Sequence, residues 1–218
     1  MPQLFRPRAN ALARNLIIAA VLFFAVFGAV VWGYFQTPYE GYTGRAPYQP
    51  VPFSHKHHVG ALGIDCRYCH NSVTRSSFAG IPPTHTCMTC HSQLWTNATM
   101  LEPVRRSLET DTPIRWVRVT KLPDYVYFNH SVHVNHGVPC QACHGRVDEM
   151  PLTYKVHGFR MRFCIACHEN PGPHLRPKNA VFAMGWKPKI DPKLLSARLM
   201  KQYHIDTAHL TDCYVCHR

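Results

Sequence analysis

The pentapeptide Cys66-Arg67-Tyr68-Cys69-His70 is the first of five copies of the pattern Cys-x-x-Cys-His in this chain of 218 residues. The other copies are Cys87-Met88-Thr89-Cys90-His91, Cys140-Gln141-Ala142-Cys143-His144, Cys164-Ile165-Ala166-Cys167-His168 and Cys213-Tyr214-Val215-Cys216-His217. Together they use all 10 cysteines of the chain. In c-type haem attachment the two thiols form thioethers to the porphyrin, and the adjacent histidine is an axial ligand of the iron. The sequence therefore predicts a pentahaem cytochrome c with five covalently attached c-type haems.

Other uses of paired cysteines explain the pattern less well. A disulfide framework needs no histidine after every second cysteine. A zinc ribbon combines two Cys-x-x-Cys units and does not require that histidine either. A thioredoxin-like redox motif occurs singly beside a strand and a helix. We therefore expect the motif histidines to be the proximal iron ligands, namely His70, His91, His144, His168 and His217.

The N-terminal part of the chain predicts a membrane anchor. Its first residues are basic, and the run from Leu16 to Phe35 then carries no charged side chain. A helix of this length spans ~30 Å, the thickness of the hydrocarbon core of a bilayer. A cleaved signal peptide begins similarly, but its apolar region is shorter and ends in small residues, whereas this run ends in Trp32-Gly33-Tyr34-Phe35. We expect an uncleaved anchor of the bacterial cytoplasmic membrane, with the N-terminus inside and the haem-binding part on the periplasmic side.

The remainder of the chain is predicted to be mostly coil with short α-helices packed around the haems. The chain has 18 prolines, which leave little room for long helices or a sheet. The helix candidates surround the haem motifs and the stretch from Leu94 to Leu108. Five porphyrins would form much of the core, as metals do in domains with few apolar side chains. Without haem, this part of the chain should be largely unfolded.

The formal net charge of +12 could indicate nucleic-acid binding, but other features of the chain oppose that interpretation. No run of basic residues is dense enough to suggest a polynucleotide site. Each haem carries two propionates, which offset much of the positive charge and suit arginine as a partner. We expect no nucleic-acid partner.

Two stretches repeat the pattern Phe-(Ser/Asn)-His-x-x-His followed by Gly-(Ile/Val)-x-Cys. One copy runs from Phe53 to Cys66 and the other from Phe128 to Cys140, and a second haem motif follows each. We therefore expect two-haem modules at 53–127 and 128–176. The other predicted parts are a cytoplasmic tail at 1–15, the transmembrane anchor at 16–35, a linker at 36–52 and a C-terminal segment with the fifth haem at 177–218.

The spacing His-x-x-His places two imidazoles on one face of a helical turn. Such a pair cannot occupy both axial positions of one iron, because those positions lie on opposite faces of the porphyrin. Each pair is therefore expected to serve two different, adjacent haems. This hypothesis makes His55, His58, His130 and His133 distal ligands.

The fifth distal ligand stays open at this point. His204 and His209 precede the last motif, and Met150 and Met161 lie between the third and fourth motifs. Met150, Met161 and His209 are the candidates that we retain. Five further histidines are expected to bind no iron, namely His57, His85, His136, His157 and His174.

Several longer stretches carry a resemblance to a known family. They are Pro52-Phe53-Ser54-His55, Gly63-Ile64-Asp65-Cys66, Leu101-Glu102-Pro103-Val104-Arg105, Leu122-Pro123-Asp124-Tyr125-Val126-Tyr127-Phe128-Asn129-His130 and Cys143-His144-Gly145-Arg146-Val147-Asp148-Glu149-Met150. With the anchor and the C-terminal motif, they resemble the pentahaem cytochrome c subunit of bacterial alternative complex III, a quinol:electron-acceptor oxidoreductase. The resemblance implies an iron–sulfur subunit, polytopic quinol-binding membrane subunits and a monohaem cytochrome c as partners.

The resemblance also implies an electron-transfer role within a respiratory or photosynthetic complex, in which the chain carries electrons from quinol oxidation to a periplasmic carrier or oxidase. Such a chain is not itself an enzyme, because the haems carry the redox chemistry. A free-standing membrane-anchored multihaem quinol dehydrogenase is the alternative. A catalytic multihaem reductase is less favoured, because it needs an open iron position and this chain has spare ligands.

Overall fold

The computed structural model describes residues 6–37 and 41–217 of the chain. The chain divides into one unit that ends at Thr43 and a second compact unit that begins at Gly44. The first contains the long helix α1, and the second contains all five Cys-x-x-Cys-His motifs. We call the second unit the body and describe each unit by itself.

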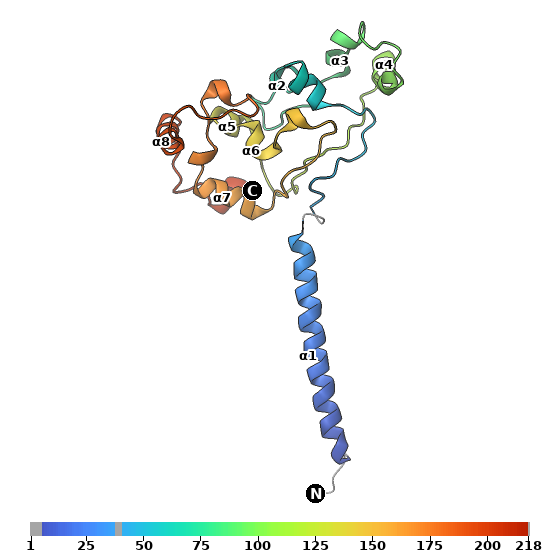
Figure 1. Ribbon diagram of the computed structural model, residues 1–218, viewed down its shortest axis with the longest axis vertical. Helices are drawn as coiled ribbons and strands as arrows, with labels where there is room; N and C mark the ends of the chain where they lie inside the picture. Colours follow the sequence, from blue (N-terminus) through green and yellow to red (C-terminus); the bar gives the residue numbers. More distant parts are fainter. Residues whose placement is uncertain (1–5, 38–40, 218) are drawn as a thin grey trace. The chain divides into compact units, whose positions relative to one another are not determined.

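Helix α1 runs from Pro7 to Gln36 without interruption (Figure 1). It begins upstream of the predicted anchor, so the described part of the expected tail is largely helical. A proline in the first turn suits a helix start, and the helix ends where the Thr37 hydroxyl donates to the Tyr34 carbonyl at 2.7 Å. The span Arg8–Gln36 has a mean hydropathy of 2.6 and buries none of its residues within the protein. An apolar helix of this length could anchor the chain in a membrane.

Short helices separated by irregular connections make up the body (Figure 1). The α-helices are α2 (Cys66–Cys69), α3 (Thr84–His91), α4 (Glu102–Glu109), α5 (His130–Asn135), α6 (Cys140–His144), α7 (Met161–Glu169), α8 (Pro192–Gln202) and α9 (Cys213–Cys216). Shorter turns are the π-helix η1 (Lys56–Ala61) and the 3₁₀-helices η2 (Thr99–Leu101), η3 (Val147–Glu149), η4 (Gly172–His174) and η5 (Lys178–Ala180). The predicted character of the fold, short helices after one apolar N-terminal helix, agrees with this arrangement.

Two helices differ from the sequence prediction. The stretch from Leu94 to Leu108 is not one helix, because Trp95 has a left-handed backbone with φ of 57° and α4 begins only at Glu102. Helix α8 was not foreseen. It begins where the Asp191 carboxylate accepts from the main-chain N–H groups of Lys193 and Leu194, with proline in its first turn.

The apolar core of the body consists of small clusters of buried residues. They are Val51 with Leu101 and Val104, Val73 with Val134 and Val181, and Leu175 with Leu199 and Tyr203. A domain of this size ordinarily buries one larger core. The second cluster takes one residue from each of the two predicted modules and one from the C-terminal segment, so these three parts interlock.

The two modules exchange matching contacts. In the first, the N–H of Lys56 donates to the carbonyl of Met150 at 3.0 Å. In the second, the N–H of Ser131 donates to the carbonyl of Ser76 at 3.1 Å. Lys56 and Ser131 each directly follow the first histidine of a His-x-x-His pair, so each pair is seated on a segment of the other module.

Candidate haem-binding site

None of the 10 cysteines forms a disulfide, and each Cys-x-x-Cys-His motif lies in or at the end of a short helix. The two cysteines of a motif are three residues apart and so share one helical face. Within the described ranges, no group of three His, Cys, Asp or Glu side chains is placed to hold a bare metal ion. The thiols are therefore arranged in pairs beside a histidine, as thioether attachment of a porphyrin requires.

Each of the four predicted distal histidines lies opposite the histidine of a different motif. The distances between ring centroids are 6.5 Å for His55 and His70, 6.1 Å for His58 and His91, 6.3 Å for His130 and His144, and 6.0 Å for His133 and His168. Two imidazoles on opposite sides of one metal ion, with metal–nitrogen bonds of about 2.0–2.1 Å, place their ring centres roughly 6.3 Å apart. The side chains thus fit an iron between the rings of each pair.

The Nδ1 atoms of seven of these eight histidines, all except His144, and of His217 in the fifth motif make hydrogen bonds. Seven rings use a main-chain carbonyl, which is that of Ser54 for His58 (2.9 Å), Gly80 for His70 (2.7 Å), Leu94 for His91 (3.1 Å), Ser77 for His130 (2.7 Å), Asn129 for His133 (2.7 Å), Leu210 for His168 (2.8 Å) and Tyr125 for His217 (3.0 Å). An eighth ring, His55, uses the hydroxyl of Thr153 at 2.7 Å. A carbonyl acceptor fixes the proton on Nδ1 and leaves Nε2 to bind a metal.

Burial keeps His55 and His144 neutral. It lowers the pKa of His144 to about 4, with a further contribution from nearby His130. Burial, followed by the proximity of His70, also lowers the pKa of His55 to about 4. An imidazole must be neutral to bind iron, so these rings are in the competent form at neutral pH.

The phenylalanine of each repeat orients both histidines of its pair. The Phe53 ring stacks on His58 at 4.4 Å and meets His55 edge-on at 4.9 Å. The Phe128 ring stacks on His133 at 4.5 Å and meets His130 edge-on at 4.7 Å. The sequence indicated this residue only as part of a repeat. The reason for it is packing, because one ring fixes two imidazoles in different orientations.

The two histidine pairs differ in the secondary structure that carries them. His130 and His133 lie in α5, as a helical turn predicts. His58 lies in the π-helix η1, where the N–H of Leu62 bonds the carbonyl of His57, five residues earlier. A single π-turn inside a short helix is a feature that sequence spacing does not indicate.

Thiols of neighbouring motifs lie close together. Burial is the largest cause of the raised pKa values of Cys69, Cys143 and Cys164. A thiol of another motif adds to each, in the pairs Cys69–Cys87, Cys143–Cys167 and Cys164–Cys216. The Cys66 thiol, followed by burial, raises the pKa of Cys140. The first motif therefore adjoins the second and third, and the fourth adjoins the third and fifth.

Hydrogen bonds agree with this arrangement of neighbouring motifs. The hydroxyl groups of Tyr68 and Thr89, each inside a motif, are 2.7 Å apart. The carbonyl of Leu210, just ahead of the fifth motif, accepts from His168 of the fourth. The N–H of Tyr127 donates to the carbonyl of Cys216 at 2.8 Å, which joins the fifth motif to the end of the first predicted module.

The candidates for the fifth distal ligand have different surroundings. The side chain of His209 is 76% exposed, and its Nδ1 lies 3.0 Å from the Asp212 carboxylate. Met150 is buried at 3% exposure, whereas Met161 is 63% exposed at the start of α7, one turn before Cys164. The described contacts bring none of them opposite His217.

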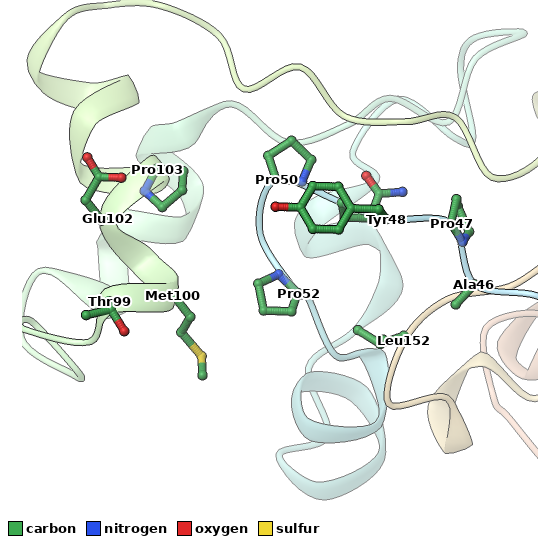
Figure 2. Close-up of a pocket in the computed structure, with 11 residues that line it drawn as sticks. Ala46, Pro47, Tyr48, Pro50, Pro52, Thr99, Met100, Glu102, Pro103 and Leu152 are labelled. Carbon is green, nitrogen blue, oxygen red and sulfur yellow. The ribbon is translucent and has the colours of Figure 1, made fainter.

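A surface hollow of about 610 Å³ lies apart from these side chains. Figure 2 shows Tyr48 and three nearby prolines on one side of it and Met100 with Glu102 on the other. No cysteine or histidine lines it. The hollow is therefore distinct from the candidate haem-binding residues.

No protein-family model matches the chain. A curated relative is the multihaem cytochrome c subunit of menaquinone reductase from Nitratidesulfovibrio vulgaris strain Hildenborough. The two sequences are 31% identical over 183 residues, which cover 74% of this chain and 86% of the relative. The similarity therefore extends over most of both proteins.

Proposed function

The chain belongs to the family of multihaem cytochrome c subunits of quinone-linked oxidoreductases, and we propose that it binds five c-type haems and relays electrons from quinol oxidation to a periplasmic carrier or oxidase. The observation that carries this proposal is the set of four histidine pairs. Their centroid separations of 6.0–6.5 Å suit a bis-histidine iron, and each distal ring faces the histidine of a haem motif.

In this proposal, the paired thiols of each motif form the thioethers, and the motif histidine is the proximal ligand. His55, His58, His130 and His133 are the distal ligands for the first, second, third and fourth motifs, respectively. Met161 is the candidate we favour for the fifth, because it lies on the same helical face as Cys164, which adjoins Cys216. When bound, the haems supply one-electron redox chemistry at potentials that their ligands and surroundings set.

The protein's own part is to hold and orient the ligands. Carbonyl groups fix the Nδ1 protons, and Phe53 and Phe128 fix the ring orientations. Contacts between motifs support an order along the body of second, first, third, fourth and fifth. The ends of this row, at the second and fifth motifs, are the places where partners would deliver and withdraw electrons.

Helix α1 is proposed to anchor the chain in the cytoplasmic membrane, with the body on the periplasmic side. The Arg8 and Arg14 side chains near its N-terminal end favour a cytoplasmic N-terminus. The run from Leu16 to Phe35 contains no Asp, Glu, His, Lys or Arg side chain that could deprotonate quinol. The quinol chemistry would therefore take place in partner subunits.

The resemblance to alternative complex III supports a specific set of partners. These would be an iron–sulfur subunit, polytopic quinol-binding membrane subunits and a monohaem cytochrome c. The opposite direction of electron flow, from a periplasmic donor to menaquinone, is a second candidate function. It is favoured by one observation, the name of the relative, which is a component of a menaquinone reductase.

Purification from mild detergent followed by stopped-flow mixing with menaquinol or ubiquinol analogues tests the proposal. We expect the haems to be reduced rapidly in the complex with its partners and not in the isolated chain. Rapid reduction of the isolated chain would favour the free-standing dehydrogenase instead. If electrons enter only from a reduced periplasmic carrier and pass to menaquinone, the second candidate is correct.

A further inference from the structure

Two of the proposed iron sites are closely equivalent in the repeat. His55 lies opposite His70 with an angle of 9° between the rings, and His130 lies opposite His144 with an angle of 4°. In each, the distal histidine is held by a residue of the other module, Thr153 for His55 and Ser77 for His130. The geometry of the two sites is thus nearly the same.

The acceptor at Nδ1 differs between these two sites. His130 donates to a main-chain carbonyl, as do six other predicted ligands, whereas the acceptor for His55 is the side-chain hydroxyl of Thr153, 2.7 Å away. A carbonyl is present whatever the side chain, but the hydroxyl is specified by one residue. The residue at position 153 therefore determines whether His55 has a partner.

The acceptor influences the iron through the imidazole. When Nε2 binds iron, Nδ1 carries the proton and donates it in a hydrogen bond. The stronger that bond, the more electron density the ring gives to the metal, and the more the ferric state is favoured. The same bond limits rotation of the ring about its Cβ–Cγ bond, which sets the orientation of the ligand plane.

We propose that Thr153 is a positioning residue for His55, which fixes the plane of that imidazole across the module boundary and lowers the reduction potential of the first motif's site. The inference rests on the proposed ligation of iron by His55. It assigns to the second module a direct influence on an iron site of the first. It also distinguishes two otherwise equivalent sites by the acceptor at Nδ1 of the distal histidine, a side-chain hydroxyl for His55 and a main-chain carbonyl for His130.

The test compares Thr153→Val, which keeps the shape and removes the hydroxyl, with Thr153→Ser, which keeps the hydroxyl. Both are made in the full-length protein with its haems attached, and the readouts are a potentiometric titration followed by absorbance and the low-spin EPR spectrum. We expect T153V to shift one midpoint potential upward and to move one low-spin signal, with T153S matching the unchanged protein. Thr153→Ala should give the same upward shift if T153V proves unstable.

The inference is wrong if T153V leaves every midpoint potential and EPR signal unchanged, or if T153S shifts them as much as T153V does. The variant His55→Ala separates this failure from failure of the ligand assignment. If H55A turns one haem high-spin while T153V has no effect, only the role of Thr153 is refuted. If H55A leaves all haems low-spin, the proposed ligation by His55 fails.

Discussion

Two glycines that link a histidine pair to its haem motif should differ sharply in their tolerance of alanine. Gly63 and Gly137 occupy matching places in the repeat, and both have a left-handed backbone, with φ of 68° and 82°. A Cβ atom on Gly63 would meet open space. A Cβ atom on Gly137 would collide with the Tyr203 ring and lie 2.6 Å from the carbonyl oxygen of Arg176.

The neighbours of Gly137 are not free to move away. Tyr203 is buried, and its hydroxyl donates to the same Arg176 carbonyl at 2.9 Å. The N–H of Arg176 in turn donates to the carbonyl of Gly137 at 2.8 Å. A left-handed backbone costs an alanine about 1–2 kcal/mol, which is the whole expected effect of G63A. Overpacking adds roughly 1–3 kcal/mol for G137A, for a total of about 2–5 kcal/mol.

Thermal unfolding followed by far-UV circular dichroism measures the difference, with haem content checked in each variant. An apparent Tm for G137A roughly 2–12 °C below that of G63A is expected, since 1 kcal/mol corresponds to about 2–4 °C for a domain of this size. Equal Tm values, or a lower value for G63A, would refute the packing described for Gly137.

Two further predictions follow from the proposed sites and the small core. His130→Ala should turn about one haem in five high-spin without loss of covalent attachment, as measured by absorption and EPR spectroscopy, and an unchanged spectrum in a folded protein would count against this ligand. The chain produced in a host that cannot attach c-type haem should lack a folded body, because the described apolar clusters are small. Cooperative thermal unfolding of that haem-free body, or its resistance to protease, would contradict this expectation.

The sequence predicted those features that depend on local spacing. The five motifs, the apolar run of α1 and the division into short helices can each be read from neighbouring residues. The histidine pairs were proposed from a three-residue spacing and a repeat. The separations of His58 from His91 and of His133 from His168, 6.1 Å and 6.0 Å between ring centroids, are consistent with that proposal.

Features that depend on contacts between distant residues could not be predicted. The hydrogen bond from His55 to Thr153 joins residues 98 positions apart, and no local pattern marks Thr153. The π-turn of η1 and the left-handed backbone of Trp95 depart from helix propensity. Both occur in segments with contacts to distant residues, from Lys56 to Met150 and from Trp95 to His57. The hydrogen bonds that join each histidine pair to the other module form only in the folded body. No local sequence pattern around Met150 or Ser76 predicts them.

The ratio of haem to protein tests the central claim most directly. A pyridine haemochrome assay on the purified protein, with the protein quantified by amino-acid analysis, gives this ratio independently of partners and of the direction of electron flow. We predict five haems for each chain, with an absorption spectrum dominated by low-spin iron, because four sites have a facing histidine and candidates exist for the fifth. A ratio clearly below five, or a dominant high-spin spectrum, would contradict the account.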